Sequence, residues 1–360
     1  MKTKILDCTL RDGSYSLNFS FDASDTYNIV KNLSDVGINF IEIGHGLGQG
    51  ASKNTKYKAR CSDKQYLKST EKLKNSVKWG VFCIPGIASF DDLKMALDHG
   101  CKFFRVGSNL ENYKDQEKYI NYLKKHQVMV CSNLMKSYLL KPKPFSKITH
   151  EMNKMGADVV YLVDSAGSMF PKDIEDYFYE IKNINKNIKL GFHGHDNLGL
   201  SNANALMAHK LGFDIIDCSL QGIGRSAGNT GLEQFVSCLL MNKVDLDIDI
   251  LKLIEISEKY IIKKHKYLKI DPLDLIMGLT QFHSSYMEII QKYAKKYKVD
   301  PKKMIIMCSK INNNETTELI AEKIAKKIKS ENNKKFVWKH FYKNYFGKEQ
   351  SILEDHGKKY

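Results

Sequence analysis

Eight times in succession, the sequence alternates between a short run of β-branched and aromatic residues and a longer stretch with amphipathic helical spacing. The predicted strands are Lys4–Thr9, Phe40–Ile43, Lys78–Ile84, Phe103–Val106, Val128–Asn133, Val159–Val163, Lys189–His195 and Ile215–Leu220. The predicted helices are Ala23–Val36, Lys64–Asn75, Phe90–His99, Gln116–His126, Phe145–Met155, Lys172–Asn183, Ser201–Lys210 and Gly231–Leu240. Because parallel strands need a crossover connection, usually a helix, this alternation predicts a parallel sheet.

Eight such units predict an α/β fold of the (β/α)8 TIM-barrel type, for which about 250 residues is typical. The structural alternative is an open doubly wound sheet, which would carry a glycine-rich phosphate turn after its first strand. The turn after the first strand here, Leu10–Tyr15, is charged rather than glycine-rich. We therefore predict a TIM-barrel catalytic domain over residues 1–245.

The pattern changes after residue 245, where helical periodicity replaces the strands. Further helices are predicted at Leu251–Lys264, Asp274–Tyr297 and Thr316–Lys327. A helix boundary is predicted at Asp271, because the residue before a proline disfavours the helical conformation. We predict a smaller helical C-terminal domain over 246–330 and a charged C-terminal extension over 331–360.

The net charge of +15 raises the question of an acidic partner. The lysines are scattered through most helical stretches, and the sequence has no basic motif interleaved with aromatic residues. We therefore predict solvated helix faces and no nucleic-acid partner, while an anionic substrate would be attracted. A basic scaffold without catalytic activity is the alternative from another class. It would bind polynucleotides in a salt-sensitive way and ignore chelators.

The sequence has no apolar run long enough to span a bilayer. Residues 1–7 lead directly into a strand-like segment, without the apolar core of a signal peptide. We therefore predict a cytoplasmic protein without a membrane partner. None of the eight cysteines belongs to a C-x-x-C pair, which favours buried free thiols over a thiolate zinc site.

The active site of a TIM barrel lies where its strands end, so polar residues at these positions are the candidates. His193 and His195 lie two apart on a predicted strand, and their imidazoles therefore face the same way. With Asp12, which follows the neighbouring first strand, they would form a set of two histidines and one carboxylate. Such a set suits Mn²⁺, Mg²⁺, Co²⁺ or Zn²⁺. The alternative is that the two histidines are only packed and hydrogen-bonded.

Arg11, directly before Asp12, points to enolate chemistry. A 2-oxo acid can chelate a metal through its carboxylate and keto oxygen, and the metal then polarises the keto group. A guanidinium beside it would stabilise the oxyanion that develops as the enolate forms. The alternative is an ordinary ion pair with Asp12. The loop Gly222–Asn229 offers backbone donors to anions, or is simply a tight turn.

The other polar residues at strand ends receive supporting roles. The predicted substrate-binding residues besides Arg11 are His45, Asn133 and Ser165. Carboxylates and histidines at strand ends often hold metal ligands in position without touching the metal. That role is predicted for Glu42 and Asp164, and for His45 as well. Arg105, on the fourth predicted strand, is expected at the same end of the barrel and is assigned no specific role.

Four segments carry a family resemblance: Leu6–Gly13, Ile41–Gly46, Phe192–Gly199 and Gly222–Asn229. Together they resemble the DRE-TIM metallolyases, a superfamily that includes HMG-CoA lyase, isopropylmalate and citramalate synthases and 4-hydroxy-2-oxovalerate aldolase. The segments span the whole predicted barrel in order. Within the superfamily the chain looks most like the last enzyme. Residues 45–48 and the helical segment 274–286 are similar to that aldolase and to its small C-terminal communication domain.

The resemblance implies a divalent metal, usually Mn²⁺, held by Asp12, His193 and His195. Asn229 matches a position that is a further ligand in the HMG-CoA lyase branch. The resemblance also implies that Arg11 stabilises a pyruvate enolate, and that Ser165 helps to bind the 2-oxo acid.

One departure from the aldolase concerns its catalytic histidine, which lies two residues after the glycine of its Arg-Asp-Gly motif. Here that position is Tyr15. The aldolase also brings a tyrosine from its C-terminal domain to the site, and the matching position here is His283, before Ser284. We therefore predict that His283 is the general base and that Tyr15 is its hydrogen-bonding partner.

The function that follows is cleavage of a 4-hydroxy-2-oxo acid to pyruvate and an aldehyde, or the reverse condensation. The alternative enzyme is a Claisen-type synthase that joins an acyl-CoA to a 2-oxo acid, because the loop Gly224–Asn229 resembles that of the synthases. The predicted small-molecule partner is an anionic 2-oxo acid. The candidate protein partners are a second copy of the chain and an aldehyde dehydrogenase, with which the similar aldolase works.

Overall fold

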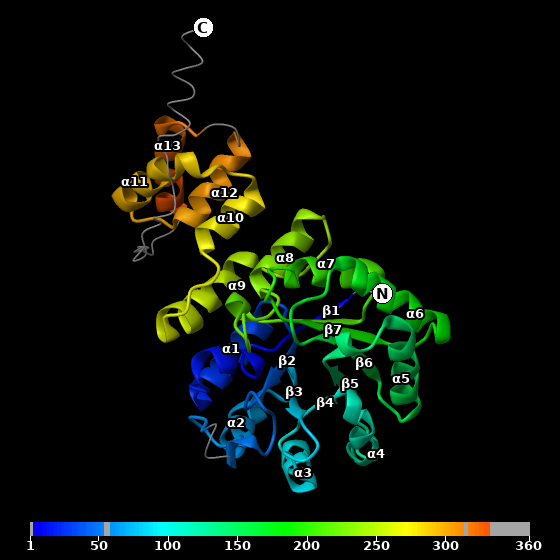
Figure 1. Cartoon of the computed structure of the whole chain (residues 1–360). Coiled ribbons are helices and arrows are strands. Elements are labelled where there is room, and N and C mark those ends of the chain that lie inside the picture. Colours follow the sequence, from blue (N-terminus) through cyan, green and yellow to red (C-terminus); the bar gives the residue numbers. More distant parts are fainter. Residues whose placement is uncertain (1–2, 54–57, 313–315, 332–360) are drawn as a thin grey trace. The chain divides into compact units, whose positions relative to one another are not determined.

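A closed barrel of eight parallel strands forms the first of two compact units of the chain (Figure 1). The computed structural model describes residues 3–53, 58–312 and 316–331. Each strand pairs in parallel with the next, and β8 closes the barrel on β1. The strands are β1 (Lys4–Asp7), β2 (Phe40–Ile43), β3 (Lys78–Cys83), β4 (Phe103–Asn109), β5 (Met129–Met135), β6 (Val159–Asp164), β7 (Leu190–Gly194) and β8 (Ile215–Cys218). The predicted TIM barrel is confirmed.

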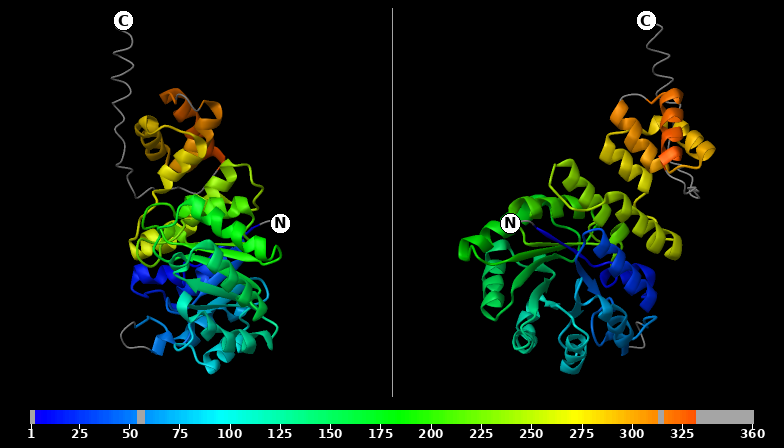
Figure 2. Two further views of the ribbon diagram at one scale, coloured as in Figure 1. Left: turned by 45° about the vertical axis from the view of Figure 1, so that its right-hand side comes forward. Right: turned by 180° about the vertical axis from the view of Figure 1, so that it is seen from behind.

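A helix follows each strand and packs outside the barrel (Figure 2). The helices are α1 (Ala23–Asp35), α2 (Asp63–Thr70), α3 (Phe90–Asp98), α4 (Glu117–Lys124), α5 (Pro142–Lys154), α6 (Pro171–Ile184), α7 (Ser201–Leu211) and α8 (Leu232–Met241). The largest difference from the predicted starts is at α5, which begins three residues earlier, at Pro142. Proline is favoured in the first turn of a helix because its missing N–H needs no partner there.

The barrel interior is filled by layers of side chains from alternate strands, as TIM barrels require. One layer from the even-numbered strands is apolar and consists of Phe40, Phe103, Val159 and Ile215. Two residues further along each of these strands, on the same face, lies a second layer that consists of Glu42, Arg105, Tyr161 and Asp217. Three of the four residues in this second layer are ionisable acids or bases that form ion pairs with one another. The periodicity of the sequence did not predict this polar layer.

Two glycines make room for the large side chains of these layers. A Cβ atom on Gly191 of β7 would lie 2.4 Å from the ring of Tyr161, and one on Gly80 of β3 would lie 2.4 Å from the ring of Phe103. No real Cβ atom tolerates such a distance to a fixed ring, because interiors are close-packed. Glycines on β3 and β7 therefore leave space in the barrel interior for the large side chains of β4 and β6.

The first unit continues to Lys269, beyond the boundary at 245 that the sequence suggested. Helix α9 (Ile250–Ser257) and the following π-helix η7 (Glu258–Lys263) contribute Leu253, Ile256 and Ile261 to the core cluster that surrounds the barrel. These apolar residues are buried against the barrel helices, so a loss of strand periodicity does not mark the end of this compact unit.

The second unit, Ile270–Tyr360, contains α10 (Pro272–Thr280), α11 (Met287–Tyr297), α12 (Pro301–Ile311) and α13 (Glu318–Glu331). The single helix predicted over Asp274–Tyr297 is divided, because Gln281 adopts a left-handed conformation (φ 53°) that ends α10. Helix α12 was not predicted, although Asp300 caps it and a proline occupies its first position. Apart from Glu331, the predicted extension 331–360 lies outside the described residues. Among the described helices, none combines the length and apolar character needed to cross a bilayer.

Replacing Gly191 by alanine should destabilise the barrel, because the new methyl group would overlap the ring of Tyr161. Overpacking of this kind lowers the free energy of unfolding by about 1–3 kcal/mol. Urea titration followed by circular dichroism measures the effect. Gly278→Ala is the control, since its Cβ would meet nothing within 4 Å. A Gly191→Ala variant as stable as the wild type would contradict this account of the interior.

Candidate active site

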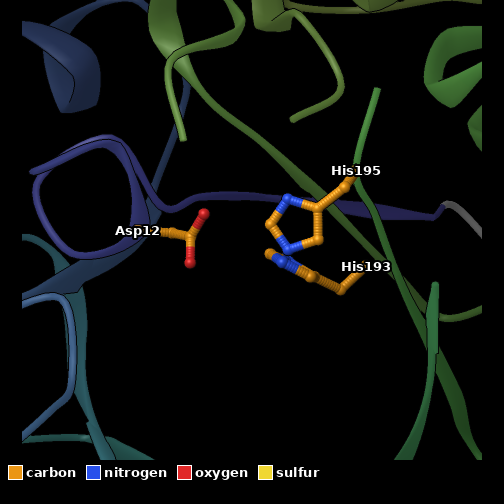
Figure 3. A group of neighbouring side chains, drawn as sticks. All are labelled: Asp12, His193 and His195. Atoms are coloured by element: carbon orange, nitrogen blue, oxygen red, sulfur yellow. The ribbon is translucent and has the colours of Figure 1, made fainter. Parts of the chain in front are cut away.

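Asp12, His193 and His195 come together at the carboxyl ends of β1 and β7 (Figure 3). One ligand atom from each lies within 4.8 Å of the other two, and all three residues are buried. In Figure 3 the carboxylate of Asp12 faces the two imidazoles across a gap. The structure therefore brings together the three residues that the sequence suggested as metal ligands.

Hydrogen bonds determine which nitrogen of each imidazole is available. Nδ1 of His195 lies 3.2 Å from the carbonyl oxygen of Gly228, which can only accept, so this nitrogen carries the proton. Nδ1 of His193 lies 2.8 Å from Oδ2 of Asp217 and is held in the same way. In the neutral form of each ring, the lone pair then lies on Nε2. Burial lowers the pKa of His195 to about 4, so its ring is neutral at neutral pH.

Asp12 is ionised despite its burial. Burial alone would raise its pKa, but the guanidinium of Arg11, 2.7 Å away, and the two imidazoles hold the pKa of this carboxyl well below its usual range. Asn229 adds a further hydrogen bond, because its Nδ2 donates to Oδ2 of Asp12 at 2.9 Å. The amide oxygen of Asn229 is buried and accepts no hydrogen bond from the described residues. A buried orphan acceptor beside a carboxylate and two imidazole lone pairs fits a divalent cation.

A chain of buried ion pairs connects the two sides of this site. Nε of Arg11 donates to Oε2 of Glu42 at 2.6 Å, and the same oxygen accepts from Nη1 of Arg105 at 2.8 Å. Nη2 of Arg105 donates to Oδ2 of Asp217, which also holds His193. Burial alone would raise the pKa of Asp217, but Arg105 and His193 lower it. The layer of polar residues inside the barrel thus links Arg11 to a metal-site histidine.

Sequence reasoning missed Asp217 and gave Arg105 no role. The sequence did contain a signal for both: each is a charged residue within an otherwise apolar predicted strand. Fully buried ionisable residues are almost always paired, so each of them implied a partner of opposite charge. Glu42 contacts Arg11, which in turn contacts Asp12. Asp164 does not orient the ligands with its side chain, which instead accepts from the backbone of Ser168 and Met169 at 3.0 Å each.

A cavity of about 560 Å³ opens beside the three clustered residues. Small-molecule sites typically measure about 300–1,000 Å³. Its walls include the predicted site residues Arg11, Asp12, Tyr15, Asn133, Ser165, His193 and His195. They also include Leu47, Phe82, Ile84, Met135, Lys136, Tyr138 and Arg225. The Oδ1 atom of Asn133 is buried and accepts no hydrogen bond from the described residues.

Two predicted residues lie elsewhere. His45 is buried but is not among the residues that line the cavity; its ring stacks on Phe19 at 4.4 Å, and its Nδ1 accepts from the backbone of Leu47. It therefore contacts Leu47 of the cavity wall without lining the cavity itself. His283 is an exposed residue of the second unit, between α10 and α11.

The chain is similar to known proteins in both sequence and fold. A family model described as HMGL-like matches residues 2–259. The chain is 31% identical over 306 residues to a 4-hydroxy-2-oxovalerate aldolase of Carboxydothermus hydrogenoformans, covering 85% of this chain and 91% of that protein. It is 33% identical to 4-hydroxy-2-oxovalerate aldolase 4 of Rhodococcus opacus, covering 85% and 88%. The hydroxymethylglutaryl-CoA lyase of Pseudomonas aeruginosa shares the fold, with a TM-score of 0.62 at 17% identity, covering 75% and 95%.

Removing the charge of Arg105 should destabilise the barrel strongly, because Glu42 and Asp217 would remain buried without their shared cation. Breaking one partner of a buried pair lowers the free energy of unfolding by about 3–5 kcal/mol. Urea unfolding of the Arg105→Met variant measures this.

The matched control for this experiment is Lys124→Met. It makes the same change of charge in the half-exposed pair with Asp158 and should lower the free energy of unfolding by about 0–1 kcal/mol. Equal stability of the two variants would show that the interior network is not stabilising.

Proposed function

The chain belongs to the HMGL-like family, and from this premise we propose that it is a divalent-metal-dependent aldolase. The substrate would be a 4-hydroxy-2-oxo acid, and the products pyruvate and an aldehyde; the same site would catalyse the reverse condensation. The broader statement, that the chain is a carbon–carbon lyase, rests on curated relatives that cover most of its length. The finer proposal depends on one observation: Arg11 and the Asp12–His193–His195 cluster line the same cavity.

A divalent ion would be held by Asp12, by Nε2 of His193 and of His195, and by the orphan amide oxygen of Asn229. When bound, such an ion supplies a Lewis acid for the keto oxygen of a 2-oxo acid. The mixed nitrogen and oxygen ligands suit Mn²⁺, our first choice, and also Mg²⁺, Co²⁺ or Zn²⁺.

Arg11 has a free donor for the substrate. Its Nε and Nη1 atoms are engaged by Glu42 and Asp12, whereas no oxygen of the described residues accepts from Nη2. Since the side chain lines the cavity, this group would donate to the keto oxygen as negative charge develops on it. The pair with Glu42 keeps the guanidinium in place, so that little reorganisation accompanies the reaction. Ser165 and Asn133 would bind the remaining polar groups of the substrate.

The reaction needs a base for the 4-hydroxyl group. We assign this role to His283 and a supporting role to Tyr15 of the cavity wall, because these two positions exchange the histidine and the tyrosine of the similar aldolase. Loss of the hydroxyl proton forms the carbonyl of the aldehyde, the C3–C4 bond breaks, and its electron pair passes to the enolate of pyruvate. Return of the proton to C3 then gives pyruvate. Histidine is suited to both transfers because its ordinary pKa lies near neutrality.

Metal removal tests the proposed reaction. We expect the protein as purified, or loaded with Mn²⁺, to release pyruvate from a series of 4-hydroxy-2-oxo acids. EDTA should abolish the activity and Mn²⁺ should restore it, but not in an Asp12→Asn variant. Pyruvate is measured with lactate dehydrogenase and NADH.

A parallel assay for free CoA, with acyl-CoA and a 2-oxo acid as substrates, detects the Claisen alternative. Release of CoA but no pyruvate would refute the aldolase. Polynucleotide binding without either reaction would indicate a scaffold.

Replacing His283 by alanine should lower kcat by about 10²–10⁴-fold, the usual contribution of a general base. The amount of bound Mn²⁺, measured by metal analysis, should not change. His126→Ala is the control, because His126 is an exposed histidine in the turn that follows α4. Wild-type turnover in the His283→Ala variant would end this assignment and leave the metal site unaffected.

A further inference from the structure

We propose that the aldehyde half of the substrate carries a second anionic group, a carboxylate or a phosphate, and that Lys136 and Arg225 bind it. This inference rests on the proposed function and adds the substrate class to it. Both side chains contribute to the wall of the cavity that contains Arg11 and Asp12. The pyruvate half would occupy the region of Arg11 and the clustered metal-site residues, which leaves Lys136 and Arg225 for the other half.

The cavity has more positive charge than a simple 2-oxo acid needs. Asp12, Glu42 and Asp217 oppose the guanidinium groups of Arg11 and Arg105, which leaves one negative charge in this buried set. A divalent ion and the single carboxylate of a 2-oxo acid would together bring the set to neutrality. The charges of Lys136 and Arg225 are additional to this set.

In the described part of the first unit, no carboxylate forms an ion pair with the side chain of Lys136 or Arg225. Other cations of this unit do have such partners; for example, Lys269 pairs with Asp196 at 2.7 Å. Asp12 is the one carboxylate among the residues that line the cavity, and it is already engaged by Arg11. An anionic ligand in the cavity would supply a counter-charge to both side chains.

The loop after β8 holds Arg225 in place at the cavity. Its backbone N–H donates to Oδ2 of Asp12 at 3.2 Å, which ties the residue to the metal-site carboxylate. Its guanidinium carbon lies 5.6 Å from the ring centroid of Tyr15, within the range of a cation–π contact. The next residue, Ser226, has a left-handed backbone (φ 60°) and accepts a hydrogen bond from Asn197 at 2.7 Å.

Lys136 is held from the opposite part of the barrel, directly after β5. Its backbone is left-handed, with φ 61° and ψ 41°, a conformation that costs a residue with a side chain about 1–2 kcal/mol. Its N–H donates to Oγ of Ser165 at 2.9 Å, and its carbonyl accepts from Leu139 at 3.0 Å. Maintaining an unfavourable backbone at a cavity wall is typical of a functional position. Ser165 would thus position Lys136 as well as bind substrate.

The test is aldol addition of pyruvate to matched pairs of aldehydes by the Mn²⁺-loaded full chain. Butanal is compared with succinic semialdehyde, and glycolaldehyde with glycolaldehyde phosphate, so that the two pairs separate a carboxylate from a phosphate. We expect kcat/KM to be at least about tenfold higher for the anionic member of one pair. A hydrogen bond to a charged group contributes about 1.5–3 kcal/mol, which corresponds to roughly 10–100-fold.

Lys136→Gln and Arg225→Gln should each lower this anionic-to-neutral ratio by about tenfold or more. Arg225→Lys, which keeps the charge, should retain most of it. Lys143→Gln removes the same charge from an exposed position of α5 outside the cavity and should leave the ratio unchanged. Circular dichroism verifies that each variant is folded.

Equal use of neutral and anionic aldehydes by the wild type would overturn this inference and leave the aldolase intact. A ratio that falls equally in the Lys143→Gln variant would also overturn it, because general attraction would then explain the preference. Failure of pyruvate to react with any aldehyde, together with no pyruvate release from 4-hydroxy-2-oxo acids, would remove the proposed function and this inference with it.

Discussion

The geometry of the site depends on the buried bridge that Arg105 makes between Glu42 and Asp217 inside the barrel. Transferring charged groups from water into the protein interior is unfavourable in free energy, so they are found there only when opposite charges and hydrogen bonds compensate them. Here signs alternate along the chain of contacts from Asp12 through Arg11 to Asp217, which ends at His193. Strands far apart in the sequence are therefore held at one relative position, and two proposed metal ligands with them.

This arrangement would couple the stability of the folded chain to the binding of a cation. Three buried carboxylates face two guanidinium groups, so this set of five side chains keeps one uncompensated negative charge close to the two imidazoles. A cation that binds only the folded chain would lower the free energy of that state in proportion to its affinity. The same side chains that make the barrel interior costly to assemble would thus prepare it for a divalent ion. Arg11 contributes to both effects, because it neutralises Glu42 and also lines the cavity.

A structural feature of this protein can be predicted from the sequence when residues close together in the chain determine it. Alternation between strands and helices is local, and all eight strands of the barrel follow from it. His193 lies on β7 and His195 follows directly after it, while Asp12 comes after β1, which β8 separates from β7. All three follow the carboxyl ends of barrel strands, so their convergence could also be expected. Asp217 was missed because its partners lie on β4 and β7, and a single acid within Ile215–Cys218 does not reveal them. The first unit extends past residue 245 because Leu253 and Ile256 are buried against the barrel helices, and such burial cannot be read from local periodicity.

The exchange of a catalytic histidine for Tyr15 acquires a physical reason from its neighbour Arg225. A phenol ring offers its negative face to a guanidinium, whereas a histidine that gains a proton during catalysis would repel it. A cation at this wall and a base at the position of Tyr15 are therefore poorly compatible. A chain that uses Arg225 to recognise an anionic aldehyde would have to take its base from another position, and His283 is the residue that we propose for this role. On this view, the unusual base and the charged cavity wall are two consequences of one change in substrate.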